Sequence, residues 1–281
     1  MNPVSRTAFY CCGIRMLDAQ SSDPVCGDAY AKRFMDEDGL RVFKSFVPFA
    51  NPNASNVARH RIIDDLLRQR LAESPQTRVV LVGCGFDSRA YRLQGGTWIE
   101  VDEAPLIAYK NDRLPITECS NELHRLTIDF AKDSLTEKLA AYSSDQPVCV
   151  VIEGVLMYLT NVQIDRLIDS VQRLFPRHEL VCDLMSSRFF QKYSRAVHAQ
   201  IQVLGATFRL HSDTPEQLFR DRGYHSRETV SIVGRAIQLG SVRIPRLIFK
   251  WFLRTLADGY GVHVFTFLRE AAPERSADFD I

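Results

Sequence analysis

The feature that most constrains the fold is an alternation of short apolar runs with helical patterns, which begins at Arg78. Such an alternation is typical of βαβ units, in which helices cover both faces of a parallel sheet. A further segment, residues 262–270, alternates like a strand and is expected to close the sheet near the C-terminus. The sequence therefore predicts an α/β fold, with strands over RVVLVG (78–83), TWIEVD (97–102), LHRLTID (123–129), VCVVIEG (148–154) and HELVCDLM (178–185).

One helix can be delimited closely, between the fourth and fifth predicted strands. Thr160 and Gln163 form a capping box at its start, and Pro176 stops it. The spacing of its apolar residues predicts an amphipathic helix between these limits, with a face made of Ile164, Leu167, Ile168, Val171, Leu174 and Phe175.

Composition excludes several functional classes. The chain has 35 Lys and Arg residues against 34 Asp and Glu, so it lacks the basic excess that usually marks a nucleic-acid-binding protein. No run approaches the roughly 18 apolar residues of a membrane span. Seven cysteines show no C-x-x-C pair and no spacing with histidines that would form a metal site. We therefore expect a cytoplasmic protein with reduced thiols, no resident metal, and neither nucleic-acid nor membrane partners.

The first predicted strand runs into a G-x-G turn, Gly83 and Gly85, which suggests close approach of the backbone to a cofactor. Dinucleotide-binding turns carry a third glycine, in the pattern G-x-G-x-x-G, and here Ser88 stands in that place. Asp87 also adds a negative charge at the mouth of the turn, which would repel a pyrophosphate and suit a cationic or hydroxyl-rich ligand. S-adenosylmethionine fits that description, because it has a sulfonium, an ammonium and a ribose.

The second predicted strand supports the same ligand. Asp102 ends it nineteen residues after Gly83, the place from which a carboxylate can hold ribose hydroxyls. Asp129 and Glu153 end two further strands at the same edge of the sheet, where ligands of open α/β sheets bind. Together with the turn, these positions favour a cofactor site over a set of solvated acids.

Arg59 lies upstream, in the predicted helix VARHRIIDDLLRQRL (57–71). A helical wheel places it on the apolar face with Ile62 and Ile63, whereas Arg61 points the other way. A buried guanidinium needs an anionic partner, so Arg59 predicts a carboxylate inside the fold. The carboxylate of a bound cofactor and one of the protein's own acids are both candidates, and an arginine near a helix start can also extend its head to solvent.

The remaining segments are predicted to elaborate a single domain, because 281 residues lie at the upper end of what one hydrophobic core usually holds. Residues 1–56 are expected to form a helical N-terminal cap that ends in a polar linker, PFANPNASN (48–56). Residues 57–185 would form the cofactor-binding α/β core. Residues 186–270, in which aromatic and basic residues mix, would supply a substrate cap and the closing strands, and residues 271–281 a loose tail.

Three stretches of the chain together resemble the leucine carboxyl methyltransferase family. They are RHRIIDDLLRQRLAESPQTRVVLVGCGFDSRAYRL (59–93), WIEVDEAPLIAYKNDRL (98–114) and CVVIEGVLMYLTNVQIDRLIDSVQRLFPRHELVCDLMS (149–186). The chain is most similar to the bacterial branch that includes the tetracenomycin-type polyketide O-methyltransferases, and the likeness extends over nearly its whole length. The resemblance implies a class I methyltransferase (Rossmann-like) fold with a seven-stranded sheet, the last strand antiparallel, and S-adenosylmethionine as the methyl donor.

The resemblance also assigns roles to individual positions around the glycine turn. Gly83 and Gly85 would form the turn under the methionine moiety of the donor, with Asp87 beside it. Asp102 would hold the ribose hydroxyls. Glu153 would lie near the methionine amino group.

Four further donor contacts follow from the same resemblance. Asp129 and Phe130 would border the adenine. Arg59 matches the arginine that binds the cofactor carboxylate in the family, in agreement with the helical wheel. Arg15, in the N-terminal cap, would be a second contact for the donor.

The acceptor is expected to be a small molecule, such as a polyketide-like product of secondary metabolism. Tyr158 matches a tyrosine that faces the acceptor in the family. The phosphatase-directed members carry an arginine after the acid-apolar pair that ends the third strand, and here Ala131 stands there. The cap contributes aromatic residues that are candidates for an apolar pocket, namely Phe189, Phe190, Tyr193, Phe208, Trp251 and Phe252.

The expected reaction is O-methylation by in-line methyl transfer, in which positioning of the acceptor oxygen is the main task. A carboxylate acceptor needs no general base, whereas a hydroxyl acceptor would need one, and His198 and His211 in the cap are the candidates. The absence of an evident base favours carboxyl methylation. The alternatives are a protein C-terminal carboxyl methyltransferase, an NAD-type oxidoreductase and a non-catalytic Rossmann-like module.

Overall fold

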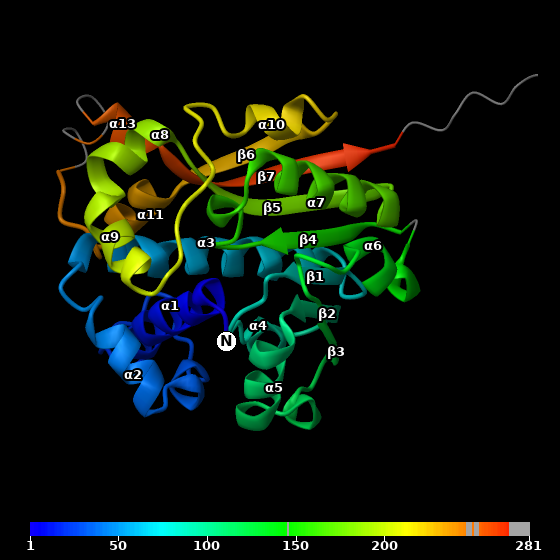
Figure 1. Ribbon diagram of the computed structural model, residues 1–281, viewed down its shortest axis with the longest axis horizontal. Coiled ribbons are helices and arrows are strands. Elements are labelled where there is room, and N and C mark those ends of the chain that lie inside the picture. The colour runs from blue at the N-terminus through cyan, green and yellow to red at the C-terminus, as the bar shows by residue number, and fades with distance from the viewer. Residues whose placement is uncertain (145, 246–248, 250–252, 270–281) are drawn as a thin grey trace, which may run out of the picture.

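A seven-stranded sheet forms the centre of the protein, in the order β3-β2-β1-β4-β5-β7-β6 (Figure 1). The computed structural model describes residues 1–144, 146–245, 249 and 253–269, so the predicted tail, 271–281, lies outside the described residues. Strands β1 to β5 pair in parallel, whereas β7 is antiparallel to both β5 and β6, which confirms the predicted fold. The strands are β1 (Arg78–Val82), β2 (Thr97–Asp102), β3 (Glu122–Thr127), β4 (Val148–Ile152), β5 (Arg177–Met185), β6 (His225–Ser231) and β7 (Tyr260–Leu268).

Helices cover both faces of the sheet, because its central strands are apolar on both sides. Val79 and Leu81 of β1 pack with α3 and α11, whereas Val80 and Val82 pack with α6 and α7. The helices of the described residues are α1 (Pro3–Ala19), α2 (Glu37–Lys44), α3 (Ala50–Glu73), α4 (Arg89–Arg92), α5 (Ala104–Arg113), α6 (Leu135–Lys138), α7 (Asn161–Leu174), α8 (Ser187–Phe189), α9 (Arg195–Val203), α10 (Gln217–Arg220), α11 (Ile232–Gln238) and α13 (Arg254–Asp258). None of them combines the length and the apolar character needed to cross a membrane.

The helices α1, α9 and α11 lie on the side toward which β4 points in Figure 1. The N-terminal cap is tied to the glycine turn by aromatic packing. Phe86, which follows Gly85, stacks on Phe34 with ring centroids 5.0 Å apart and contacts Phe9 of α1 at 5.0 Å. The turn is therefore held between the sheet and the cap.

The capping box and the limits of the predicted helix after the fourth strand are confirmed. Thr160 is the N-cap of α7, its side chain accepts from the backbone of Gln163, and the helix ends at Leu174. Two other features differ from expectation. The segment 48–56, expected as a linker, is helical from Ala50 onward and forms the first two turns of α3. Strand β6 carries mostly exposed polar side chains and lies at the edge of the described sheet beside β7, so it gives no apolar signal in the sequence.

Candidate functional site

A cavity of about 1520 Å³ lies at the carboxyl ends of the parallel strands, between the sheet, α1, the start of α3 and the segment after β5. Ligands of open α/β sheets bind at this end, and a pocket for one small ligand usually measures about 300–1,000 Å³. The volume is therefore sufficient for two molecules side by side. The cavity brings together the predicted donor-binding residues and Tyr158, whereas Phe190 does not line it; the residues that do are Arg15, Arg59, Gly83, Gly85, Asp87, Asp102, Asp129, Phe130, Glu153 and Tyr158.

The glycine turn leaves bare backbone facing the cavity. Gly83 and Gly85 have φ values of 71° and 48°, in the left-handed region that favours glycine. A Cβ atom on Gly83 would lie 2.5 Å from Cγ2 of Val155, so a side chain cannot be added there without displacing the loop after β4. This geometry allows a ligand to approach the backbone closely.

Asp102 lies beside the turn at the end of β2, and 7% of the residue is exposed. Its two carboxylate oxygens accept from the backbone N–H of Gly85 (2.7 Å) and of Glu103 (2.8 Å). Burial raises its pKa, and the two N–H groups oppose that rise. Within the described residues no cationic side chain contacts it, so its carboxylate has acceptor capacity left for hydroxyl groups in the cavity.

Arg59 is buried on α3 and donates to two carboxylates of the protein. Its Nε donates to Glu153 Oε1 (3.0 Å), and its Nη1 donates to Asp183 Oδ2 (3.1 Å) and to the Tyr260 hydroxyl (2.8 Å). The predicted buried carboxylate is therefore present, and it is supplied by the protein itself. A Cβ atom on Gly154 would lie 3.1 Å from Nη2, so a glycine is needed beside the guanidinium.

One edge of this guanidinium keeps donor capacity. Among the described residues, Nη2 of Arg59 has only long contacts, with Asn56 Oδ1 at 3.4 Å and Cys11 Sγ at 3.9 Å. All three of these residues line the cavity. A ligand carboxylate placed there would receive a charge-assisted hydrogen bond from a group that the protein does not fully satisfy.

Arg89 is a central residue that the sequence argument missed. It is fully buried, and it donates to Asp87, to Glu153 Oε2 (2.8 Å) and to Asp64 Oδ1 (2.6 Å). The charge of Asp87 is thus compensated by a residue two positions along, and Asp87 does not face the cavity as a free anion. The position of Arg89 in the motif GCGFDSR, directly after Asp87 and Ser88, is the signal that would have identified it.

The same guanidinium bears on metal binding. His60, Asp87 and Glu153 offer ligand atoms within 4.8 Å of one another. Arg89 contacts all three of them, including His60 Nδ1 at 2.7 Å, so a cation of the protein already occupies the space between them. Burial and Arg89 lower the pKa of His60, which keeps the ring neutral.

Arg15 links the N-terminal cap to the turn. Its Nη2 donates to the carbonyl of Phe86 (2.7 Å) and its Nε donates to Asp28 Oδ2 (2.9 Å). Asp28 is fully buried, and although burial alone would raise its pKa, Arg15 and Arg92 outweigh that effect and lower it to about 2. Arg15 therefore stabilises the wall of the cavity.

The side of the cavity near β3 is more open. Asp129 pairs with Lys132 (3.1 Å) and accepts from the backbone N–H of Ala131 (3.0 Å). Phe130 is 42% exposed and presents a ring at the rim. A planar ligand group can stack on such a ring.

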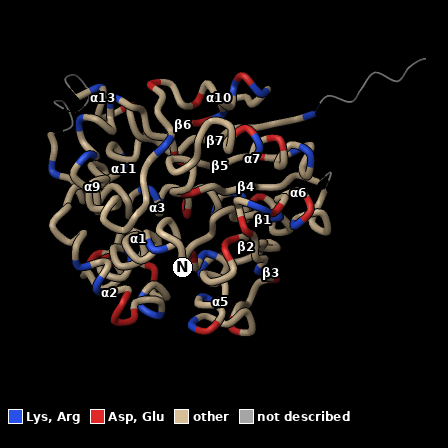
Figure 2. The backbone as a smooth tube through the Cα atoms, viewed as in Figure 1, with Lys and Arg blue, Asp and Glu red and all other residues tan. Residues whose placement is uncertain are grey.

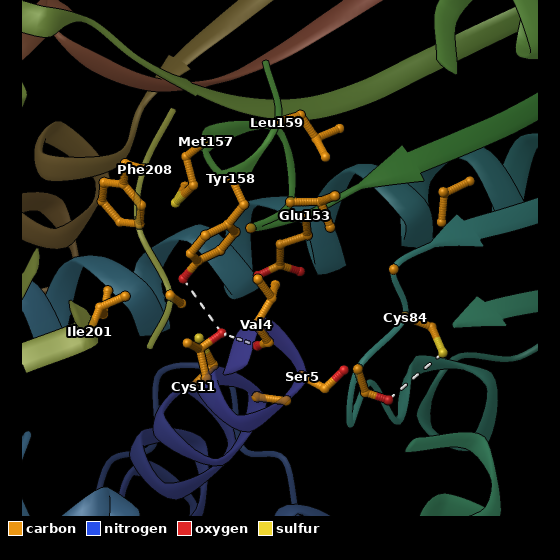
Figure 3. A pocket seen from close by; sticks show the side chains of 18 of the residues that line it. Val4, Ser5, Cys11, Cys84, Glu153, Met157, Tyr158, Leu159, Ile201 and Phe208 are labelled. Atoms are coloured by element: carbon orange, nitrogen blue, oxygen red, sulfur yellow. Dashed lines mark hydrogen bonds between the residues drawn. The ribbon is translucent and has the colours of Figure 1, made fainter. Parts of the chain in front are cut away.

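The opposite side of the cavity is apolar. Tyr158 packs edge-on against Phe208, with ring centroids 5.2 Å apart, and its hydroxyl lies 3.4 Å from Thr7 Oγ1 of α1. Figure 3 shows Tyr158, Met157, Phe208 and Ile201 around this part of the cavity. Trp251 and Phe252, expected here from the sequence, lie outside the described residues, whereas Phe189 and Tyr193 line the cavity.

The two histidines considered as bases do not line the cavity. Nε2 of His198 accepts from the backbone N–H of Phe208 (3.0 Å), so this nitrogen is already engaged. His211 lies against the outer face of Phe190, with ring centroids 6.2 Å apart.

Comparisons with known proteins identify relatives of this chain. Residues 8–172 match the family model of the leucine carboxyl methyltransferases. A protein of Mycolicibacterium gilvum named "Putative S-adenosyl-L-methionine-dependent methyltransferase" is 31% identical over 190 residues, which are 61% of this chain and 63% of that protein. The S-adenosyl-L-methionine-dependent methyltransferase dpfgK of Gibberella zeae is 24% identical over 267 residues, which are 88% and 87% of the two chains.

Solved structures show the same fold. The crystal structure of a "putative methyltransferase" from Thermobifida fusca matches with a TM-score of 0.61 and 12% identity, over 86% of this chain and 93% of that one. The alignment with the first of the sequence relatives spans about three fifths of that relative's length. The expected cofactor, S-adenosylmethionine, is confirmed as the cofactor of this group of proteins. The match to the family model, over more than half of the chain, shows that this chain belongs to the leucine carboxyl methyltransferase family.

Proposed function

We propose that the protein is an S-adenosylmethionine-dependent O-methyltransferase that methylates a carboxylate of a small, largely apolar metabolite. The observation that carries the proposal is the single cavity, which joins the glycine turn, Asp102 and Arg59 on one side to an apolar chamber around Tyr158 on the other. A methyl donor and an acceptor can therefore lie in contact without crossing a wall of the protein.

The residues present fit the donor. The bare backbone of Gly83 and Gly85 allows close approach, and Asp102 has acceptor capacity for the ribose hydroxyls. The free edge of Arg59 suits the methionine carboxylate, and Glu153 suits the amino group. When bound, the donor supplies an electrophilic methyl group; the protein's part is to bind, to orient and to exclude water.

Asp129 and Phe130 would border the adenine, at the open side of the cavity. Arg15 donates to Asp28 and to the carbonyl of Phe86, so it would support the donor through the wall that it holds.

The apolar side of the cavity supports a hydrophobic acceptor. Its described lining there includes no histidine, and the residues that contribute to it are Met157, Tyr158, Met185, Phe189, Tyr193, Val197, Ile201, Phe208, Val233, Val242, Ile244, Leu253 and Leu256. Acids that line the other side, such as Asp87 and Glu153, are paired with guanidinium groups and are poor bases. A carboxylate acceptor is already an anion at neutral pH and needs no base, so these observations favour methyl ester formation.

Tyr158 would orient the acceptor. Burial raises the pKa of its hydroxyl, which keeps it protonated and able to donate to an acceptor oxygen.

The test is transfer of a labelled methyl group from S-adenosylmethionine to a panel of apolar carboxylic acids and matched alcohols and phenols, with products identified by mass spectrometry. Labelled methyl esters are the expected result, and they hydrolyse in mild alkali, whereas ethers do not. Binding of a nicotinamide dinucleotide without binding of S-adenosylmethionine in calorimetry would refute the proposal.

A further inference from the structure

Charged side chains form one connected, buried set that runs from the N-terminal cap to β5, and we call it the buried charge network. Neighbours along it lie within ion-pair distance of one another; Arg92, for instance, donates to Asp64 (2.6 Å) and lies 3.6 Å from Asp28. No side chain in it is more than 14% exposed. In order along the contacts its members are Arg15, Asp28, Arg92, Asp64, Arg89, Glu153, Arg59 and Asp183, with Asp87 as a side branch that contacts Arg89.

The network contains one more carboxylate than guanidinium group: five acids against four arginines among the described residues. His60, which contacts Arg89 and Arg92, adds no charge because burial lowers its pKa. Arg68 also approaches the network, 3.5 Å from Asp64, and it forms a second ion pair with Asp65. Its side chain is 47% exposed, so water screens its charge. The buried charge network therefore carries an excess negative charge.

This excess lies on one side of the glycine turn. On the other side, Glu100 is contacted by both Lys110 (2.8 Å) and Arg125 (2.8 Å), and all three are buried. Their surplus positive charge lies under β2 and offsets the charge of Asp102. Figure 2 shows acidic and basic residues beside one another at the centre of the molecule, near α1 and α3.

We propose that the buried charge network makes this site select the sulfonium donor over its demethylated product, S-adenosylhomocysteine, an inference that rests on the proposed function. Arg15, Arg59, Asp87 and Glu153 of the network line the cavity, so its field acts directly on a bound molecule. Donor and product share the same amino, carboxylate and nucleoside groups, and they differ in the sulfonium. The donor supplies the positive charge that the network lacks, and the product does not.

Methyl transfer removes the positive charge of the ligand that compensates the network. A lone pair of the acceptor oxygen forms the new bond to the methyl carbon, and the pair of the broken carbon–sulfur bond stays on sulfur. The sulfonium becomes a neutral thioether, and an acceptor carboxylate becomes a neutral ester. The uncompensated network then holds the product less tightly, which favours its release.

The test is isothermal titration calorimetry of the wild-type protein with S-adenosylmethionine, S-adenosylhomocysteine and sinefungin, whose amine keeps a positive charge near the position of the sulfonium. A unit charge acting over about 10 Å at an effective dielectric constant of about 20 changes a binding constant by on the order of tenfold. We expect both charged ligands to bind at least that much more tightly than the neutral product. Equal or tighter binding of the product would overturn this inference and leave the proposed function standing, whereas no binding of any of the three would overturn both.

Two isosteric variants test the cause. Asp28→Asn removes one negative charge from the network at a residue that does not line the cavity, and Asp87→Asn removes one beside the turn. Each should lower the preference for donor over product toward unity, whereas Asp112→Asn, at an exposed acid on α5, should leave it unchanged. If one variant does not fold in a thermal melt, the other decides. A preference unchanged in a folded network variant would overturn the inference.

Discussion

Asp102→Asn tests the donor site most directly, because the substitution keeps the size of the side chain and removes its charge. Asp102 contacts only backbone N–H groups in the described structure, so the acceptor capacity facing the cavity is available for ribose hydroxyls. A hydrogen bond to a charged group contributes about 1.5–3 kcal/mol. The variant should therefore bind S-adenosylmethionine about 10- to 150-fold more weakly in calorimetry.

Stability should not follow affinity. The pKa of Asp102 is raised in the folded protein, so the group binds protons more tightly when folded and, ionised at neutral pH, it opposes folding. Its contribution to stability improves as the pH falls, and Asp102→Asn removes the unfavourable charge. The asparagine side chain can accept from only one of the two backbone N–H groups, and this loss opposes the gain from removing the charge, so the Tm of the variant at pH 7 should stay close to that of the wild type.

The matched control is Asp112→Asn, the same substitution at a side chain that is 76% exposed. It should change neither affinity nor Tm. Unchanged donor affinity in Asp102→Asn would refute the ribose assignment. A loss of affinity accompanied by an equal loss of stability would also refute the ribose assignment, because it would mean that the carboxylate stabilises the folded protein and does not contact the ligand.

Three further outcomes are expected. Arg89→Met leaves buried carboxylates without their guanidinium and should lower the free energy of unfolding by about 3–5 kcal/mol in urea titrations. The control is Arg41→Met, at an exposed ion pair. A smaller loss in Arg89→Met than in this control would contradict the assigned role. Gly83→Ala forces a Cβ atom against Val155 and should lower both Tm and donor affinity, whereas Gly240→Ala, with a φ of 75° but open space around it, should lower Tm only slightly. Burial lowers the pKa of His178 to about 4, so unfolding takes up a proton between this pH and about 6.5. The free energy of unfolding should therefore fall by about 3 kcal/mol at most as the pH drops from about 6.5 to 4. His178→Gln should flatten this pH dependence in urea titrations.

The parallel part of the sheet was predictable because its strands are buried on both faces and are therefore continuous apolar runs. Residues 148–154 illustrate this, since every residue of β4 is buried. Strand β6 could not be predicted in that way, because its first residues are exposed and it is held in the sheet by pairing with β7. Pairing between distant segments leaves no mark on local periodicity.

The site was predictable where a residue conflicts with its surroundings. Arg59 interrupts an apolar helix face, and that conflict correctly indicated a buried carboxylate. The partner of Asp87 was missed because charge was assigned to each residue separately, whereas Arg89 and Asp87 compensate one another. The start of α3 was missed because Pro52 and three asparagines are typical of a linker, although a proline is tolerated in the first turn of a helix.

The packing of Phe86 on Phe34 and Phe9 ties the N-terminal cap to the glycine turn. Moving α1 away from the turn would break the Phe9–Phe86 ring pair, at about 0.5–1.5 kcal/mol, and would pull on the turn that faces the cavity. Movement of the N-terminal cap and binding at the turn are thus mechanically coupled. Any hinge motion of the cap disturbs the backbone that must be in place when the ligand binds.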